Sequence, residues 1–403
     1  MPTLYLTDII IIFLIILWGI KKITCHPERS RGIFQSGKIP PLTPIKSGIG
    51  RNDDKVALLL TSIVVFYLLF NSILIAANQW VALYKMIKII EFILLGMVIL
   101  KIKPKFDSII LFLSVGAVYS SIIAILQFIL QRSVGGILWF LGERTFYAST
   151  PGIAALSVGG RLLLRPYATF PHPNVLGGFL AVVLPMILAF IIFNKKINKV
   201  LKIWLKCVFI IGFIALFLTF SRAAWSVFLF GILFAVVNKK GGVNSFLVAR
   251  KNAFLVGFYS LLLISVSLFF FLPLKYTSFV ERYQLISATI SMVSTSFIFG
   301  VGLNNFVIRA KDYLPKVFDF YIFQPVHNVY LLIFAELGMI GFVMFMVFIF
   351  HLLLKSLKTN PLVTAAIFQI VLLGFFDHYL FTLQQGQLLF TLFASLAFLP
   401  QKN

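Results

Sequence analysis

Apolar runs of about twenty residues alternate along this chain with shorter segments that are rich in lysine and arginine. A helix needs about 20 apolar residues to cross the hydrocarbon core of a membrane. The pattern therefore predicts an all-α polytopic membrane protein, with about eleven transmembrane helices in a single domain over residues 1–403. The predicted spans are 4–20, 56–78, 81–100, 107–130, 174–193, 203–220, 223–237, 252–272, 328–354, 361–380 and 384–399.

The amino-acid composition excludes two other classes of protein. About 60% of the residues are hydrophobic and only 12% are charged, and the mean hydropathy is +1.02. Soluble domains are near half apolar and a quarter charged, and disordered chains have low hydrophobicity. The two cysteines, Cys25 and Cys207, fit neither a disulfide framework nor a CxxC metal site.

The formal net charge of +23 would suggest a nucleic-acid partner in a soluble protein. Here 23 of the 35 basic residues fall on alternate loops, which the positive-inside rule assigns to the cytoplasm, so no nucleic acid is expected. The N-terminus is then outside and the C-terminus inside. Two long loops, 131–173 and 273–327, face outward, and the stretch Tyr283–Phe299 is expected to lie along the membrane surface.

Three basic side chains are predicted to converge at the outer boundary of the membrane. Arg165 precedes the fifth span, Arg222 lies in the turn between the sixth and seventh spans, and His327 opens the ninth. Two guanidinium groups suit a diphosphate, because each matches phosphate oxygens bidentately. A histidine beside them can act as a general base near neutral pH. Single arginines such as Arg132 and Arg144 are more simply explained by contact with membrane lipids.

Other polar residues on this side are candidates for substrate binding. They are Asn174, Asn328, Arg309, Asp377 and His378. Asp377-His378 suits sugar hydroxyls, although a hydrated helical hairpin explains the pair equally well. The chain has no HExxH, Walker or CxxC motif, so neither a metal nor a cofactor is expected.

Three motifs together resemble the O-antigen ligase and O-antigen polymerase superfamily. They are Arg165–Asn174, Thr219–Trp225 with its Ser-Arg turn, and His327-Asn328 followed by Gly338 and Gly341. The resemblance covers about 165–345, which is the predicted catalytic region. Ala168 stands where the family has glycine, a departure that is expected to alter the backbone at this point.

The resemblance implies a bundle of the C-type glycosyltransferase kind and a metal-independent transferase of surface polysaccharide or lipopolysaccharide biosynthesis. Such an enzyme takes a glycan from undecaprenyl diphosphate at the outer face of the cytoplasmic membrane. It transfers the glycan to a hydroxyl of a lipid, glycan or protein acceptor. Carried over to this sequence, Arg165 and Arg222 would hold the diphosphate. His327 would activate the acceptor hydroxyl or contact the diphosphate.

Three alternatives to a ligase remain at this point. One is a polysaccharide polymerase of the same superfamily, which differs in the acceptor. Another is a transporter of lipid-linked glycans, although a transporter places its charged groups at the bilayer midplane between repeats. The third is an assembly protein without catalysis, which would not need two arginines and a histidine on one face.

Overall fold

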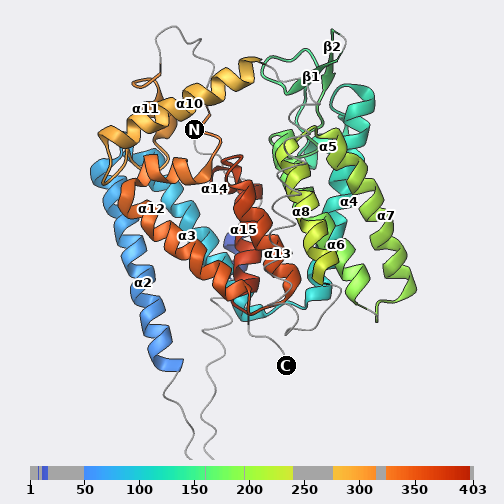
Figure 1. Cartoon of the computed structure of the whole chain (residues 1–403), viewed down its shortest axis with the longest axis horizontal. Helices are drawn as coiled ribbons and strands as arrows, with labels where there is room; N and C mark the ends of the chain where they lie inside the picture. The colour runs from blue at the N-terminus through green and yellow to red at the C-terminus, as the bar shows by residue number, and fades with distance from the viewer. Residues whose placement is uncertain are drawn as a thin grey trace, which may run out of the picture.

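The computed structural model of this chain describes residues 8, 11–16, 50–158, 160–194, 196–238, 276–314 and 324–399, which form a helical bundle (Figure 1). Its elements are α2 (Gly50–Phe70), the π-helical turn η1 (Asn71–Ile75), α3 (Gln79–Ile102), α4 (Phe106–Leu130), α5 (Ile137–Phe140), β1 (Ala155–Val158), β2 (Arg161–Leu164), α6 (Pro173–Phe193), α7 (Lys199–Leu218), α8 (Arg222–Asn238), α10 (Tyr276–Thr295), α11 (Phe306–Ala310), α12 (Val329–Ser356), α13 (Pro361–Leu373), α14 (Tyr379–Thr382) and α15 (Gln384–Ala397).

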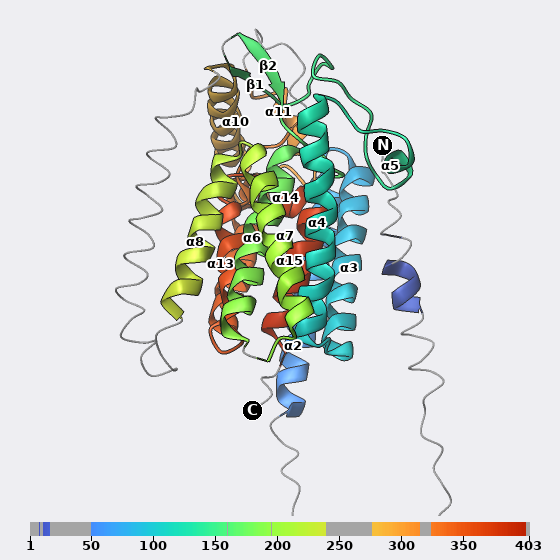
Figure 2. The same cartoon turned by 90° about the vertical axis from the view of Figure 1, so that its right-hand side faces the viewer.

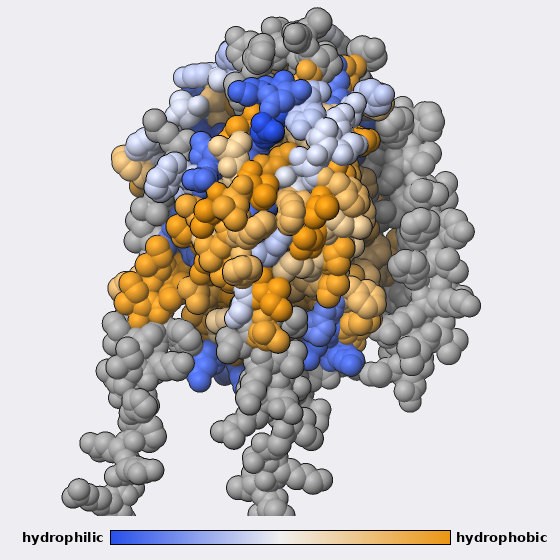
Figure 3. All heavy atoms as spheres, turned by 90° about the vertical axis from the view of Figure 1, so that its left-hand side faces the viewer, coloured by the Kyte–Doolittle hydropathy of each residue, from blue (hydrophilic) through white to orange (hydrophobic). Residues whose placement is uncertain are grey.

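Four of these helices, α4, α6, α7 and α12, are long and apolar enough to cross a membrane. Shorter apolar helices lie at 61–75, 222–234 and 361–373. Figure 3 shows a broad hydrophobic band on one face of the molecule, with hydrophilic zones above and below it. These features support a polytopic membrane protein. The number of eleven spans stays a prediction, because 252–272 and most of 4–20 lie outside the described residues.

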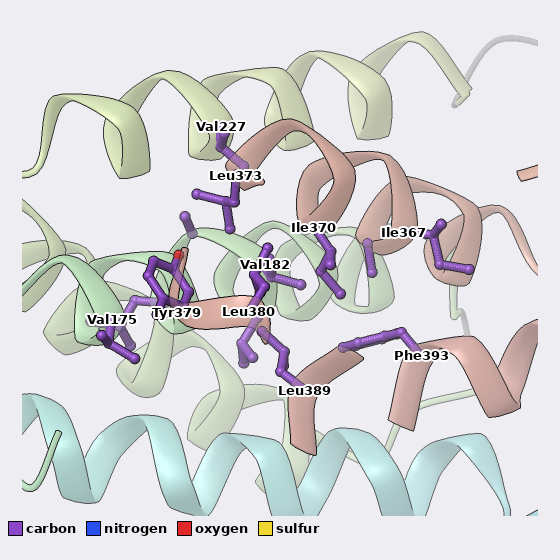
Figure 4. Close-up of a cluster of buried hydrophobic side chains, with 14 of the residues drawn as sticks. Val175, Val182, Val227, Ile367, Ile370, Leu373, Tyr379, Leu380, Leu389 and Phe393 are labelled. Atoms are coloured by element: carbon purple, nitrogen blue, oxygen red, sulfur yellow. The ribbon is translucent and has the colours of Figure 1, made fainter. Parts of the chain in front are cut away.

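Helix α6 is the most buried of the four candidate spans and packs against α4, α7, α8 and α13. Figure 4 shows its residues Val175 and Val182 in the core, close to Tyr379 of α14. A Cβ atom at Gly178 would lie 1.7 Å from the Tyr379 hydroxyl, so the missing side chain makes room for this ring. The buried tyrosine thereby fixes α14 against the start of α6.

The predicted span 361–380 is wrong as a single helix. Helix α13 ends at Leu373, and a short loop then leads to the four-residue helix α14. The carbonyl of Gly374 accepts a hydrogen bond of 2.8 Å from the Val329 backbone N–H, and the Asp377 carboxylate accepts one of 2.8 Å from the His378 N–H. The Gly374 carbonyl and the His378 N–H thus bond to partners other than those of a continuing helix. Helix α13 therefore ends here, and the loop faces the start of α12.

The described part of the chain is mostly helical, as expected, and the first long loop adds one short β-hairpin that the sequence did not predict. Strands β1 and β2 form an antiparallel hairpin there, in which Ala155 pairs with Leu164 and Val158 with Arg161. The two strands flank Gly159-Gly160, a dipeptide typical of tight hairpin turns. Each strand has only four residues, so a search for long apolar runs does not detect it.

Helix α12 is broken at Gly338, whose φ of 64° lies in the left-handed region. The segment that leads out of α10 satisfies the backbone groups freed by this break. The N–H groups of Val301 and Gly302 donate to the carbonyls of Ala335 and Glu336 at 2.8 and 3.0 Å. A Cβ atom at Gly300 would lie 2.5 Å from the backbone of Glu336, so only glycine allows this approach.

The buried carboxylate of Glu336 attaches α11 to the same break. It accepts hydrogen bonds from the backbone N–H groups of Asn304 and Phe306, at 2.9 and 3.3 Å. These backbone hydrogen bonds and the Glu336 carboxylate hold the segment after α10, and α11, against α12 (Figure 1). The surface helix expected from Tyr283–Phe299 is α10, which begins and ends a few residues earlier, at Tyr276 and Thr295.

Candidate functional site

The structure brings Arg165 to the turn that carries Arg222. The Arg165 Nε atom donates a hydrogen bond of 2.7 Å to the Thr219 carbonyl, three residues before Arg222. Its terminal nitrogen donates a second bond of 2.7 Å to Asn174 Oδ1, in the first turn of α6. Two of the three predicted segments therefore meet at the upper end of α6 and α8.

A third arginine, Arg282, belongs to this group and was not among the residues singled out from the sequence. Burial lowers the pKa of Arg165 to about 10, and the positive charges of Arg282 and Arg222 add to the effect. The Arg282 side chain is exposed, whereas that of Arg165 is half-buried. A concentration of positive charge at the boundary of an apolar bundle suits a ligand with several negative charges.

The third predicted segment brings His327 to the loop between α13 and α14. Its Nδ1 atom lies 3.4 Å from a carboxylate oxygen of Asp377, and the His378 Nε2 atom lies 4.0 Å from the same oxygen. The centres of the two imidazole rings are 5.3 Å apart. Burial would raise the pKa of Asp377, but the His327 hydrogen bond and the neighbouring imidazoles lower it far more. Asp377 is therefore ionised at neutral pH.

Asn174 joins the arginine side of the site to the histidine side. Its Oδ1 accepts from Arg165, and its Nδ2 donates a hydrogen bond of 3.1 Å to the other Asp377 oxygen. The order Arg165, Asn174, Asp377, His327 is thus one continuous chain of polar contacts. Both ends of the Asn174 amide are occupied by protein groups, which makes it a positioning residue for the guanidinium and the carboxylate.

His378 is held by Thr382, whose Oγ1 lies 2.7 Å from His378 Nδ1 and 3.1 Å from the His378 carbonyl oxygen. His327, Asp377 and His378 can offer three ligand atoms to a metal ion, all within 4.8 Å of one another. The three arginines beside this cluster oppose the binding of a cation.

Asn328 and Arg309, which the sequence suggested for substrate binding, both contact other protein groups in the structure. Asn328 caps α12, with Oδ1 accepting from the Leu331 N–H at 2.9 Å and Nδ2 donating to the Phe375 carbonyl at 3.2 Å. It thereby fixes His327 against the loop that carries Asp377. Arg309 lies on α11, where its exposed side chain pairs with Asp312 at 3.3 Å.

Ala168 has a backbone conformation that favours glycine. Its φ is 50°, in the left-handed region that is unfavourable for residues with a Cβ atom. The buried side chain of Gln127 holds this conformation. Its Oε1 accepts from the N–H groups of Tyr167 and Ala168 at 2.9 and 2.7 Å, and its Nε2 donates to the Ala168 carbonyl at 3.1 Å.

We expect Ala168→Gly to leave stability unchanged or to raise it by up to about 1 kcal/mol, since glycine adopts this φ without steric cost. The matched change Ala117→Gly, inside α4, should lower stability by about 1 kcal/mol. Gln127→Leu should cost about 2 kcal/mol or more, because three buried backbone groups lose their partner. Unfolding in mixed detergent micelles measures the stability of all three variants. Equal losses for Ala168→Gly and Ala117→Gly would contradict the left-handed backbone conformation of Ala168.

Two half-buried histidines, His172 and His378, make stability depend on pH. Burial lowers the pKa of His172, the N-cap of α6, from 6.5 to about 3, and that of His378 to about 4. Between pH 6.5 and 4 the unfolded chain binds protons that the native state does not, so stability must fall as the pH falls through this window. The apparent unfolding temperature should therefore be lower at pH 5 than at pH 7. His172→Asn retains a good N-cap and should weaken the fall of the unfolding temperature with falling pH. An equally steep fall in this variant would contradict the assignment of the effect to His172.

The fold and the site together define a helical membrane protein with a cationic site and an adjacent Asp–His pair at one end of the bundle. Residues 207–346 match a family model described as O-antigen ligase. The match includes Arg222, Arg282 and His327, and it supports the resemblance of the chain to the O-antigen ligase superfamily. No curated protein matches the chain.

Proposed function

We propose that this protein transfers a glycan from undecaprenyl diphosphate to an acceptor hydroxyl at the outer face of the cytoplasmic membrane. The observation that carries the proposal is the position of three arginines beside an Asp–His pair. Arg165, Arg222 and Arg282 interact electrostatically, and Arg165 is linked through Asn174 to the carboxylate that faces His327. A diphosphate and a reacting hydroxyl need these two kinds of group side by side.

The donor binds through its diphosphate. Arg222 and Arg282 offer planar guanidinium groups to the phosphate oxygens, and Arg165 supports them from the buried side. Their charge stabilises the leaving group as the sugar–oxygen bond breaks, since negative charge then builds up on the diphosphate. The undecaprenyl chain extends into the membrane along the apolar surface of the bundle.

The acceptor hydroxyl is activated by His327. Ionised Asp377 orients the imidazole with Nδ1–H toward the carboxylate, which leaves the Nε2 lone pair to accept a proton. The acceptor oxygen forms a bond to the anomeric carbon, and the bond between that carbon and the diphosphate oxygen breaks. The electron pair leaves with undecaprenyl diphosphate, and the hydroxyl proton passes to His327. No metal takes part, because the guanidinium groups neutralise the leaving charge.

The experiment is a transfer assay with the purified full chain in lipid vesicles. The donor is a radiolabelled oligosaccharide on undecaprenyl diphosphate, and separate reactions contain a lipid, a glycan or a peptide acceptor, each with excess EDTA. Label on one acceptor class supports the proposal and identifies ligase, polymerase or protein transferase. Transfer that stops on adding EDTA and returns with a divalent cation would instead favour a metal bound by His327, Asp377 and His378.

A further inference from the structure

The segment 133–143, which we name the α5 loop, exposes an apolar surface in the first long loop. Its exposed apolar side chains are Ile137 (74% exposed), Trp139 (59%), Phe140 (79%) and Leu141 (55%). On the opposite side, Val134 and Leu138 pack against the main core. Residues 134–142 contain no charged side chain. A contiguous apolar surface of this kind marks an interaction site.

The α5 loop folds back along α4 instead of projecting from its end. The Tyr119 hydroxyl donates a hydrogen bond of 3.2 Å to the Leu141 carbonyl. Tyr119 lies eleven residues before Leu130, the last residue of α4, which is about 16 Å along the helix axis. Figure 2 shows α5 beside α4, below the upper end of that helix. Since α4 is a candidate membrane span, the loop reaches the depth of the apolar band.

Most backbone N–H groups of the α5 loop have a hydrogen-bond acceptor within the loop, which suits a segment in contact with hydrocarbon. The buried Glu143 carboxylate accepts hydrogen bonds of 2.7 Å from the N–H groups of Val134 and Gly135. Within the loop, backbone carbonyls accept from the N–H groups of Leu138, Trp139, Leu141, Gly142 and Glu143.

We propose that the α5 loop is inserted among the lipid acyl chains of the membrane leaflet on the side of the site. The exposed Ile122, Leu126 and Ile129 of α4 lead directly to it, so its apolar surface continues a lipid-facing helix. Exposed arginines flank the loop on both sides, at Arg132 and Arg144. The Arg144 guanidinium binds the Pro171 carbonyl at 2.6 Å and lies over the Tyr167 ring, so Arg132 is the one placed to reach lipid phosphates.

The position of the α5 loop in the leaflet also fixes the depth of the segment that carries Arg165. Gln127 Nε2 donates a hydrogen bond of 2.7 Å to Glu143, and the same amide binds the backbone of Ala168, three residues after Arg165. The loop in the leaflet and the segment that carries Arg165 are therefore held by one buried side chain.

Fluorescence quenching tests this inference without any assay of activity. Cys25 and Cys207 are replaced by serine, and the full chain carries the fluorophore NBD on Phe140→Cys. The protein is reconstituted in phosphatidylcholine–phosphatidylglycerol vesicles that contain lipids with a nitroxide on the acyl chain. A matched label on Ser149→Cys, an exposed polar position of the same outer loop, is the control.

We expect the label at position 140 to emit at shorter wavelength than that at 149, and to be quenched by the acyl-chain nitroxide but not by aqueous iodide. The label at 149 should show the reverse. Quenching by iodide at position 140 would place the loop in water and overturn the inference. Protection from both quenchers would mean that a second copy or another protein covers the loop, and would overturn it equally.

Discussion

Replacement of His327 by alanine is expected to lower the turnover of glycan transfer roughly 10²–10⁴-fold, the usual contribution of a general base. The KM for the lipid-linked donor should change little, because Arg165, Arg222 and Arg282 remain in place. Initial rates of transfer at several donor concentrations separate the two quantities. The loss should appear in kcat.

His351→Ala is a matched control for this change, since His351 lies on the distal part of α12, stacked on Phe398. It should transfer glycan at the rate of the unmodified chain. His327→Arg distinguishes a base from a positive charge. Recovery of activity in the arginine variant would show that His327 acts electrostatically on the diphosphate, and would contradict the proposed base.

The second large effect is expected for Arg222→Lys. A lysine keeps the charge but not the planar fork that binds two phosphate oxygens. Hydrogen bonds to charged groups contribute roughly 1.5–3 kcal/mol, so kcat/KM should fall about 10- to 100-fold. Donor titration and single-turnover rates in vesicles measure how the loss is divided between binding and reaction.

Arg309→Lys is the control for the arginine change. Arg309 is exposed and paired with Asp312, so its substitution should leave kcat/KM within about twofold. If Arg222→Lys behaves in the same way, then Arg222 contacts membrane phosphates rather than the donor, and the diphosphate site would have to lie elsewhere.

Sequence patterns predicted the long helices well because burial in a membrane requires continuous apolar runs. Helices α4 and α6 begin within one residue of their predicted spans and end at the predicted residue. The patterns failed where tertiary contacts decide the backbone. Helix α13 stops because the carbonyl of Gly374 bonds to Val329, and the break in α12 at Gly338 depends on the segment around Gly300. Neither partner is near in sequence.

The candidate site was predictable for residues at span ends and not for residues on surface helices. Arg165, Arg222 and His327 lie beside apolar runs, where a basic residue on the outer side is unexpected. Arg282 follows Glu281 on α10, so in sequence it looks like half of a local ion pair. Its place beside Arg165 and Arg222 depends on how α10 crosses the bundle. The Ala168 conformation likewise depends on Gln127, a distant residue of α4.

The central claim is that the bond between the glycan and the diphosphate is broken in this protein by an acceptor hydroxyl. The most direct measurement is the release of undecaprenyl diphosphate by the purified chain in vesicles, followed together with the glycan gained by the acceptor. We predict one undecaprenyl diphosphate per glycan transferred, with release requiring the acceptor and nearly lost in His327→Ala. Donor that crosses the bilayer with its diphosphate bond intact would contradict a transferase and indicate a transporter.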